Sequence, residues 1–440
     1  MFHPSTLAYE SWGRIPKALP ARVVAVAPTG EIPASAEAPM LAYGKGRSYG
    51  DACLNGSGTL LTTDELDRTL VFDIENGIIR AEAGMTLAGV LARIVPHGWF
   101  LPVTPGTQFV TLGGAVANDV HGKNHHVAGT FGRFVTALEL VRSTGERLKL
   151  TPDGEHADLF RATVSGLGLT GLITWVEFRL LRIESDTIDQ ASTKFASLDA
   201  FFEVNELANA RSPYVVSWLD TLRPEGRGLL IEGDHATGPG ARLPVPGAAA
   251  SPRLSVPMDA PSWALNPLTV RAFNTVYYHK QRQLVARSRT HYRPFFYPLD
   301  AISQWNRGYG KRGFYQYQFV VPFEDSKDAV REVLDRLARA GAGSFLAVLK
   351  TFGDLPSPGL MSFPRPGVTL ALDLPNRGHD TVRLLHSCDA IVCEAGGAVY
   401  PAKDACMTPE SFRAAFPQWE TFSAFIDPAF SSSFWRRVTR

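Results

Sequence analysis

Two glycine-rich segments about 60 residues apart are the strongest constraint that this chain places on its own fold. The first, residues 42–56, has the sequence AYGKGRSYGDACLNG. The second, residues 102–132, has the sequence PVTPGTQFVTLGGAVANDVHGKNHHVAGTFG. Glycine adopts positive φ at little cost and lets backbone amides approach a ligand closely. Such segments form either tight turns between strands or the wall of a binding pocket, and the first segment by itself is compatible with both.

The glycine spacing excludes two common nucleotide motifs. A P-loop requires GxxxxGK followed by Ser or Thr, which the first segment lacks. Gly44, Gly46 and Gly50 have the spacing GxGxxxG instead of the dinucleotide fingerprint GxGxxG, and no helical period follows them. A Rossmann turn is therefore not expected here.

Three histidines in the second segment raise the question of a metal site. On a helix, His121 and His125 would share a face, as in HExxH metalloproteases. However, no glutamate stands between them, Gly122 opposes a helix, and Lys123 would repel a divalent cation. We expect no metal here, which leaves His121, His125 and His126 either on a solvated loop or in the wall of a cofactor or substrate pocket.

The first 180 residues show short strands with few helices. Residues 59–85 contain two β-rich runs on either side of Asn76-Gly77, the strongest short hairpin signal. Helical spacing follows and stops at Pro96. The expected elements are a helix at 86–95, a strand pair at 137–150 and a strand at 171–180. This pattern predicts an α+β domain.

The second half alternates strands with longer helices. Helices are expected at 324–340 and 379–395, and strands at 214–219, 314–321, 344–350 and 368–374. This interleaving predicts a sheet covered by helices on one face. Residues 233–261 contain six prolines and four glycines, so we expect a surface loop there, with a role as a lid or membrane contact as a hypothesis.

Composition narrows the class of protein. The net charge of +1 gives no support for a nucleic-acid partner. No apolar run approaches the ~18 residues of a spanning helix, and the N-terminus has no apolar stretch typical of a signal peptide. Four cysteines are too few for a disulfide scaffold. We expect a cytoplasmic protein, with peripheral attachment to the inner face of the membrane left open.

The two glycine-rich segments together resemble those of flavoproteins of the vanillyl-alcohol-oxidase type. Within that group the chain is most similar to the oxidase subunits of decaprenylphosphoryl-β-D-ribose 2′-epimerases. The stretches GRSYGD, HGKNHH, WNRGYG, QYQFVVP, SFLAVLKTFG and YPAKD occur in that family's order over nearly the whole chain. The resemblance implies a two-lobed FAD-binding (PCMH-type) domain at 1–185, a substrate domain with an antiparallel sheet flanked by helices at 186–399, and a segment at 400–440 that returns to the FAD domain.

The resemblance also implies which residues bind FAD. They lie in the two glycine-rich segments and at two positions further along the chain: Gly44, Lys45, Gly46, Arg47, Ser48, Tyr49, Gly50, Asp51, Gly106, Thr111, Leu112, Gly113, Gly114, Asn118, Asp119, Val120, His121, Ile173 and Tyr400. Some members of the group bind FAD covalently through a histidine in the first loop. Because Arg47, Ser48 and Tyr49 stand there instead, we expect non-covalent FAD.

Substrate and catalytic residues are implied in the same way. Substrate is expected near Lys123, Trp218, Tyr297, Gln316, Gln318, Lys350, Phe352 and Lys403. Strand alternation places Gln316 and Gln318 on one face, which is also compatible with the polar outer face of an edge strand. Lys403, His121 and Tyr49 are candidates for the base that takes the hydroxyl proton, and Lys403 for a cation beside the flavin.

One stretch departs from the family pattern. Where the family has WNICVDFP, this chain has VTLALDLP, so Thr369 and Ala371 replace a pocket asparagine and cysteine. A threonine has a shorter polar reach and alanine removes a thiol. Neither change abolishes hydride transfer on chemical grounds, but both bear on which sugar is bound.

The implied activity is oxidation of the 2′-hydroxyl of a polyprenylphosphoryl-β-D-ribose by hydride transfer to flavin N5. This would be the first half of an epimerisation to the arabinose donor used in cell-wall synthesis, with an NADH-dependent short-chain reductase as the partner. The alternatives are an aldonolactone or free-sugar oxidase on the same fold, a non-catalytic flavin-binding partner of a reductase, and a histidine-metal hydrolase.

Overall fold

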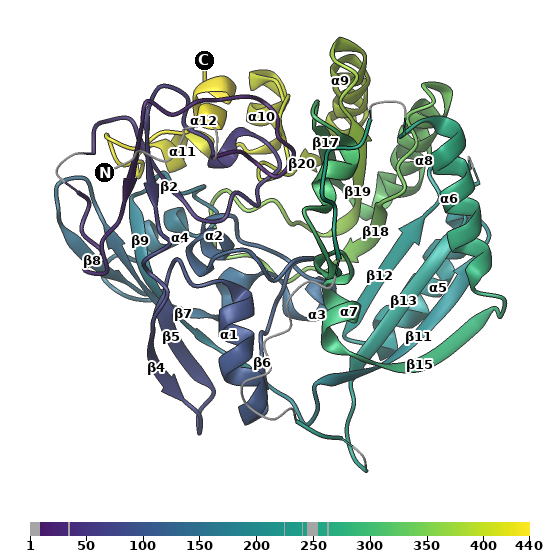
Figure 1. Cartoon of the computed structure of the whole chain (residues 1–440), viewed down its shortest axis with the longest axis horizontal. Coiled ribbons are helices and arrows are strands. Elements are labelled where there is room, and N and C mark those ends of the chain that lie inside the picture. The colour runs from purple at the N-terminus through teal and green to yellow at the C-terminus, as the bar shows by residue number, and fades with distance from the viewer. Residues whose placement is uncertain (1–8, 34–35, 224, 240, 244–253, 262–263) are drawn as a thin grey trace.

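The computed structural model describes the chain except for residues 1–8, 34–35, 224, 240, 244–253 and 262–263. The elements of the first 180 residues lie on the left of Figure 1, and a large sheet with its helices lies on the right. The last 40 residues, in yellow, rest on the N-terminal elements. None of the helices among the described residues combines the length and apolar character needed to cross a membrane.

Two main sheets form the N-terminal part. A parallel sheet has the order β1 (Arg22–Ala25), β3 (Thr59–Thr62), β2 (Met40–Tyr43). An antiparallel sheet has the order β4 (Thr69–Asp73), β5 (Ile78–Glu82), β9 (Leu172–Arg179), β7 (Val135–Val141), β8 (Arg147–Leu150). Two-residue strands form two further pairs: β10 (Leu181–Arg182) with β6 (Trp99–Phe100), and β14 (Leu254–Ser255) with β16 (Ile302–Ser303).

An antiparallel sheet of eight strands dominates the second half. Its order is β15 (Val285–His291), β11 (Thr187–Phe195), β13 (Gly228–His235), β12 (Tyr214–Leu219), β18 (Ala347–Phe352), β19 (Gly367–Pro375), β17 (Phe314–Val321), β20 (Ala398–Val399). Successive side chains on these strands point to opposite faces. Phe319, Leu349 and Leu370 join the main core, whereas Gln318, Lys350 and Ala371 line a cavity.

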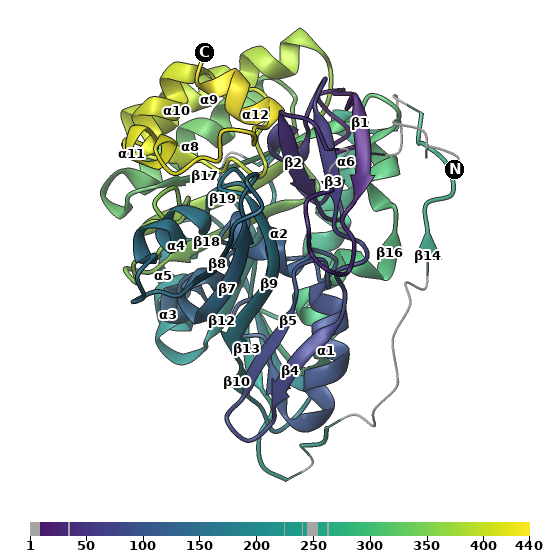
Figure 2. The same ribbon diagram turned by 90° about the vertical axis from the view of Figure 1, so that its left-hand side faces the viewer.

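Helices cover the core face of this sheet. The three longest of them there are α5 (Leu198–Arg211), α8 (Phe323–Arg339) and α9 (His379–Glu394), whose apolar residues share the core with the strands. The remaining helices are α1 (Leu87–Ile94), α2 (Leu112–Ala117), α3 (His125–Ala128), α4 (Ala157–Thr163), α6 (Pro267–Lys280), α7 (Tyr292–Phe296), α10 (Pro409–Ala415), α11 (Trp419–Ser423) and α12 (Ser433–Val438). Figure 2 shows α8, α9 and α10 stacked at the upper left, above the strands.

The expected α+β class and the antiparallel sheet flanked by helices are confirmed. The hairpin at Asn76-Gly77 joins β4 and β5, but residues 59–62 of the same run belong to the parallel sheet instead. The strand expected at 344–350 begins at Ala347 and ends at Phe352. The expected domain limits at 185 and 399 stay a prediction.

The elements that were not predicted include α5, α6, β11 and β15. α5 has no clean apolar stripe, because Asn205 lies among its buried positions. β15 is an edge strand whose side chains are mostly exposed, so it lacks the alternation of a half-buried strand. The proline-rich loop expected at 233–261 is shorter, since β13 extends to His235. The centre of this loop, residues 244–253, is outside the described part of the chain. The lid hypothesis depends on these residues and therefore stays a hypothesis.

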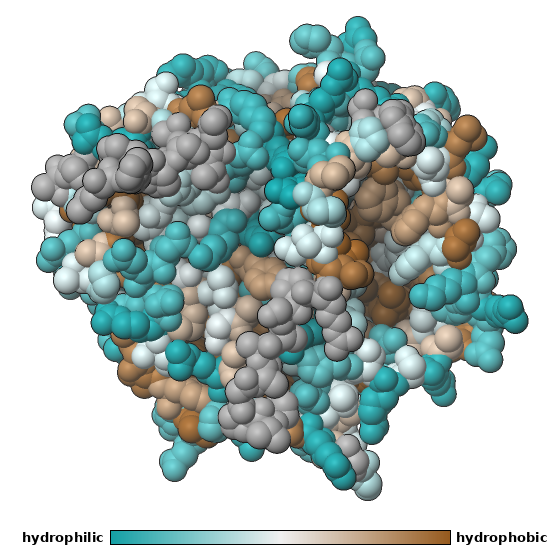
Figure 3. Space-filling model, in the orientation of Figure 1, coloured by the Kyte–Doolittle hydropathy of each residue, from teal (hydrophilic) through white to brown (hydrophobic). Residues whose placement is uncertain are grey.

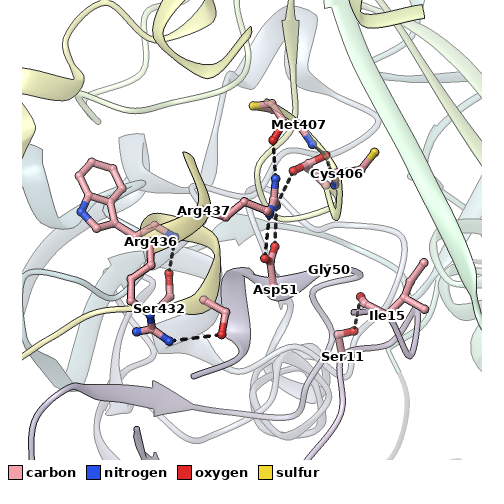
Figure 4. Close-up of polar contacts among 12 residues, drawn as sticks. Ser11, Ile15, Gly50, Asp51, Cys406, Met407, Ser432, Arg436 and Arg437 are labelled. Atoms are coloured by element: carbon pink, nitrogen blue, oxygen red, sulfur yellow. Dashed lines mark hydrogen bonds and ion pairs between the residues drawn. The ribbon is translucent and has the colours of Figure 1, made fainter. Parts of the chain in front are cut away.

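Arg437 of α12 ties the C-terminus to the first glycine-rich segment (Figure 4). Its guanidinium donates to both carboxylate oxygens of Asp51, at 2.7 and 2.9 Å, and to Asp404 at 2.8 Å. Both carboxylates are buried. Burial by itself lowers the pKa of Arg437, but Asp404 and Asp51 raise it by more, so the net shift is upward and the guanidinium stays charged.

Replacing Arg437 with Ala leaves two buried carboxylates without their counter-ion. We expect this to lower the free energy of unfolding by about 3–5 kcal/mol. Arg436, the next residue on α12, donates to the neutral acceptors Asn55 and Gly56 and is the matched control, with an expected loss of about 1 kcal/mol for Arg436→Ala. Urea unfolding followed by tryptophan fluorescence measures both. Equal losses for the two variants would contradict the importance of the charge pair.

Candidate active site

A deep cavity lies between the two glycine-rich segments and the inner face of the eight-stranded sheet. The volume of this cavity is about 340 Å³. Of the residues predicted to bind a cofactor, those that line it are Gly44, Lys45, Gly46, Arg47, Ser48, Tyr49, Gly106, Thr111, Gly113, Gly114, Asn118, Val120, His121, Ile173 and Tyr400. The opposite wall carries Gln316, Gln318 and Lys350, and Lys123 of the second glycine-rich segment and Lys403 line the cavity as well. The structure therefore brings most of the predicted site residues to one place.

Backbone constraints shape the glycine-rich wall. Thr111 caps α2, its hydroxyl accepting from the Gly114 amide at 3.2 Å. A Cβ on Gly44 would meet this same Thr111 hydroxyl at 2.5 Å. Gly46 has a φ of +58°, and a Cβ there would clash with the Tyr43 hydroxyl and the Glu10 carbonyl. The two segments therefore contact each other at Gly44, and at both Gly44 and Gly46 only glycine fits.

Gln318 and Thr369 fix the protonation of His121. The Thr369 hydroxyl donates to the Phe319 carbonyl at 2.7 Å, so it accepts from the Gln318 amide at 3.0 Å. The same amide nitrogen lies 3.1 Å from His121 Nε2, which must then accept. Burial, followed by the charge of Lys350, lowers the pKa of His121 well below its usual value. His121 is thus neutral, with its proton on Nδ1.

Three lysines meet at the cavity. The Lys350 ammonium donates to the Gly122 carbonyl at 2.9 Å. Burial lowers the pKa of Lys350 well below its usual value, and the charges of Lys403 and Lys123 lower it further. Burial also lowers the pKa values of Lys123 and Lys403 to about 8. Burial therefore disfavours the charged form of all three lysines, and a bound anion would favour that form.

Asp373 is a buried acid that sequence reasoning missed. It accepts from Gln316 at 2.6 Å and from the Tyr309 hydroxyl at 3.3 Å. Burial raises its pKa to about 7, against the opposing effects of Gln316 and Lys403. The strand alternation of TLALD places Asp373 on the same face as Thr369 and Ala371, a signal that was available in the sequence.

Tyr49 lies near both this acid and Lys403. The Lys403 ammonium sits 5.5 Å from the centre of the Tyr49 ring. Burial, with Asp373 next, raises the pKa of the Tyr49 phenol above its usual value, so the phenol stays protonated. Tyr49, Lys403 and Asp373 thus form one group of titratable side chains at the sheet side of the cavity.

Several predicted site residues lie behind the cavity wall and support it. The carboxylate of Asp119 accepts from the Gly132 amide at 2.8 Å and from Ser357 and Ser362. The Trp218 indole donates to the Phe345 carbonyl at 3.0 Å, and Tyr297 shares a 2.6 Å hydrogen bond with Thr104. The others in this position are Gly50, which packs against Asp404; Asp51, which Arg437 holds; Leu112, in the core; and Phe352, which contacts the His121 ring edge-to-face.

The other two histidines of the second glycine-rich segment contact backbone groups. His125 Nδ1 accepts from the Gly353 amide at 3.2 Å, and His126 Nε2 lies 3.1 Å from the Ser212 carbonyl. Within the part of the chain that the structure describes, no three His, Cys, Asp or Glu side chains are grouped to hold a metal ion.

Comparison with known proteins assigns the family. Residues 18–151 match the family described as FAD binding domain. The decaprenylphosphoryl-β-D-ribose oxidase of Mycolicibacterium smegmatis is 35% identical over 415 residues, which cover 91% of this chain and 89% of that protein. The chain belongs to this family of FAD-dependent oxidoreductases.

Two further relatives show how far the similarity reaches. An uncharacterized protein of Streptomyces coelicolor is 32% identical over 370 residues, covering 80% of this chain and all of that protein. A putative D-arabinono-1,4-lactone oxidase of Neurospora crassa is 29% identical over 124 residues, or 28% of this chain and 22% of that protein. For the Neurospora protein the similarity is thus confined to a small part of both chains.

The residues of this oxidoreductase fit FAD. Three buried polar atoms on the cavity wall have no hydrogen-bond partner among the described residues: Arg47 Nε, His121 Nδ1 and Gln316 Oε1. Buried polar groups are normally paired, so these atoms are suited to a polar ligand. The glycines of both segments leave backbone exposed along the same wall, as close contact with a long, flat cofactor requires.

Gly46→Ala tests the glycine-rich wall. Because this position has positive φ and no room for a Cβ, we expect the loop to shift and FAD affinity to fall on the order of tenfold or more. The readout is the flavin-to-protein absorbance ratio after dialysis against known FAD concentrations. Gly308→Ala is the control, since its Cβ would have no atom within 4 Å and its φ is not positive. A Gly46 variant with unchanged affinity would contradict the close approach.

Proposed function

We propose that this protein oxidises the 2′-hydroxyl of a polyprenylphosphoryl-β-D-ribose to the 2′-keto sugar with FAD as hydride acceptor. The reaction would be the first half of an epimerisation that a separate NADH-dependent short-chain reductase completes to the arabinose form. The observation that supports it is the wall of glutamines and lysines facing the glycine-rich segments, on a chain 35% identical to a decaprenylphosphoryl-β-D-ribose oxidase.

The glycine-rich wall would hold the cofactor non-covalently. Bound there, FAD supplies a hydride acceptor at N5 of its isoalloxazine ring. Arg47, with its free Nε, and the exposed backbone of both segments suit the polar parts of FAD. The Nδ1–H of His121 would donate to a ring acceptor or to substrate. Asp51 and Asp119 would not contact FAD in this proposal. They would hold the two glycine-rich segments in place from outside the cavity.

Lys123 and Lys350 would bind the sugar phosphate. The buried amino groups of these two lysines lack a carboxylate partner among the described residues. A bound anion would favour their charged, ammonium form. Gln316 and Gln318 lie on the same face of β17, where amide groups can donate to and accept from sugar hydroxyls. Trp218, Tyr297 and Phe352 would then shape this wall without touching substrate.

Among the three candidates for the base, Lys403 is favoured. His121 already accepts at Nε2 and is protonated at Nδ1, and the Tyr49 phenol stays protonated. Lys403 has a pKa of about 8, so a free amine is available near neutral pH. After taking the hydroxyl proton, Lys403 becomes a cation at the sheet side of the cavity, where it stabilises negative charge.

Anaerobic titration of the flavin tests this function. Decaprenylphosphoryl ribose should bleach the visible flavin band in a single turnover, because no oxygen reoxidises it. Lys403→Met should slow bleaching on the order of 100-fold while FAD stays bound. Lys311→Met, on a turn outside the cavity lining, is the matched control and should bleach like the parent protein.

The alternatives give different results in this experiment. Bleaching by a free pentose or an aldonolactone, but not by the lipid-linked ribose, would identify a soluble-sugar oxidase. Retained FAD that no sugar bleaches would indicate a flavin-binding partner without catalysis. The product ketone, trapped as its oxime, reports which hydroxyl was oxidised.

The pH dependence reports on Lys403. If its free amine takes the proton, the bleaching rate rises with pH and levels off above about 8. Asp373 raises the pKa of Lys403, so Asp373→Asn should move the midpoint to lower pH. Asp300→Asn, a cavity acid that does not shift Lys403, is the control and should leave the midpoint in place. A rate that falls on raising the pH through 8 would refute Lys403 as the base.

A further inference from the structure

The outer face of α6 is apolar and has no protein partner among the described residues. Residues four apart on a helix lie on one face. Val270 and Asn274 form the buried face, whereas Leu268, 75% exposed, and Val276, 70% exposed, lie on the outer face. Leu284, 69% exposed, follows between α6 and the edge strand β15. We call Leu268, Val276, Leu284 and Val285, all exposed, the α6–β15 surface.

Positive charge borders this surface. Between residues 254 and 293 there is one acid, Asp259, and it bonds to Arg14. The same stretch has these cations: Arg271, Lys280, Arg282, Arg287, Arg289 and Arg293. Among the described residues, Arg271, Lys280, Arg282 and Arg287 make no ion pair, and only Arg289 finds a carboxylate, Asp189. The surface thus combines exposed apolar side chains with uncompensated positive charge.

The helix α8 provides the contrast within the same molecule. Its exposed cations are paired: Lys327 with Asp199, Arg331 with Asp328, and Arg336 with Glu332. Its apolar residues Val330, Val333 and Leu337 are buried. This is the usual arrangement of a helix with one face in water, and α6 departs from it in both respects.

The inner side of α6 leads toward the cavity. The Phe273 ring lies 5.6 Å from Phe345, and Tyr277 lies 4.7 Å from Trp218. Leu346, next to Phe345, lines the cavity. In Figure 3, a hollow with brown, apolar walls opens between the positions of α6 and β17 in Figure 1. An apolar chain held at α6 would therefore lie beside the site.

We propose that the α6–β15 surface docks this protein on an anionic lipid bilayer. Exposed apolar side chains of a helix insert at the headgroup boundary, while surrounding Lys and Arg are attracted by anionic lipids. Charge complementarity favours this partner over a second copy of the chain, whose surface would bring the same positive charge opposite itself. The docked face would also deliver a lipid-linked substrate to the site through the hollow. This last step rests on the proposed function.

Vesicle co-sedimentation of the FAD-loaded full chain tests the docking. We expect binding to phosphatidylcholine vesicles that contain phosphatidylglycerol, weakened by salt, and little binding to phosphatidylcholine alone. Arg271→Gln with Lys280→Gln should weaken binding roughly 30-fold, since each cation contributes roughly fivefold. Leu268→Ser with Val276→Ser should weaken it at any salt concentration.

Matched changes on α8 are the control. Arg331→Gln with Arg339→Gln removes the same charge from another helix and should leave binding unchanged. All variants should keep their flavin absorbance, which shows that they are folded. Absent binding, equal binding to both vesicle types, or equal loss in the α8 variant would overturn the proposal. A dimer in gel filtration that the α6 changes dissociate would assign the surface to a second copy instead.

This readout is independent of turnover. Docking on phosphatidylglycerol vesicles without flavin bleaching by lipid-linked ribose would refute the proposed substrate and keep the docking surface. Bleaching by detergent-dispersed substrate without vesicle binding would refute the docking surface and keep the substrate.

Discussion

The charge pair of Arg437 with Asp51 and Asp404 is the contact on which the site depends. Asp51 lies within the first glycine-rich segment, and Asp404 follows Lys403 directly in the chain. Two buried carboxylates repel each other and lose hydration, so they are stable only with a shared cation. By supplying it, the last helix fixes the cofactor loop and the proposed base in one frame. Parts of the chain that lie 386 residues apart are joined by this one side chain.

Strand alternation separates the polar side chains of the site from the apolar side chains of the core. β17, β18 and β19 each send one set of side chains into the core and the other into the cavity. The set on the cavity side contains Gln316, Gln318, Lys350 and, behind the lining, Asp373, which would be costly to bury without partners. Their mutual contacts and the unpaired atoms of His121 and Gln316 make this wall suited to bind something polar. The same arrangement determines that Thr369, in place of the family asparagine, orients Gln318 toward His121.

Many elements of the fold and many residues of the site could be predicted from the sequence, because short-range patterns along the chain indicate them. The hairpin at Asn76-Gly77 and the helices α8 and α9 have strong short-range signals, a turn dipeptide and a 3.6-residue apolar period. α5, β11, α6 and β15 were missed because their exposed or mixed residues carry no period. The expected site residues were mostly placed at the cavity, but Trp218, Tyr297 and Phe352 turned out to lie behind its wall.

By itself, the sequence determined the α+β class, the paired glycine-rich segments and the family. Glycine positions, hydrophobic periodicity and the order of motifs can all be read from short stretches of the chain. Only the tertiary structure decided which groups can titrate and how. Burial sets the pKa values of Lys403 and Asp373, and a hydrogen-bond chain from Phe319 through Thr369 and Gln318 sets the His121 tautomer. These properties depend on neighbours distant in sequence and on the exclusion of water, which no linear pattern records.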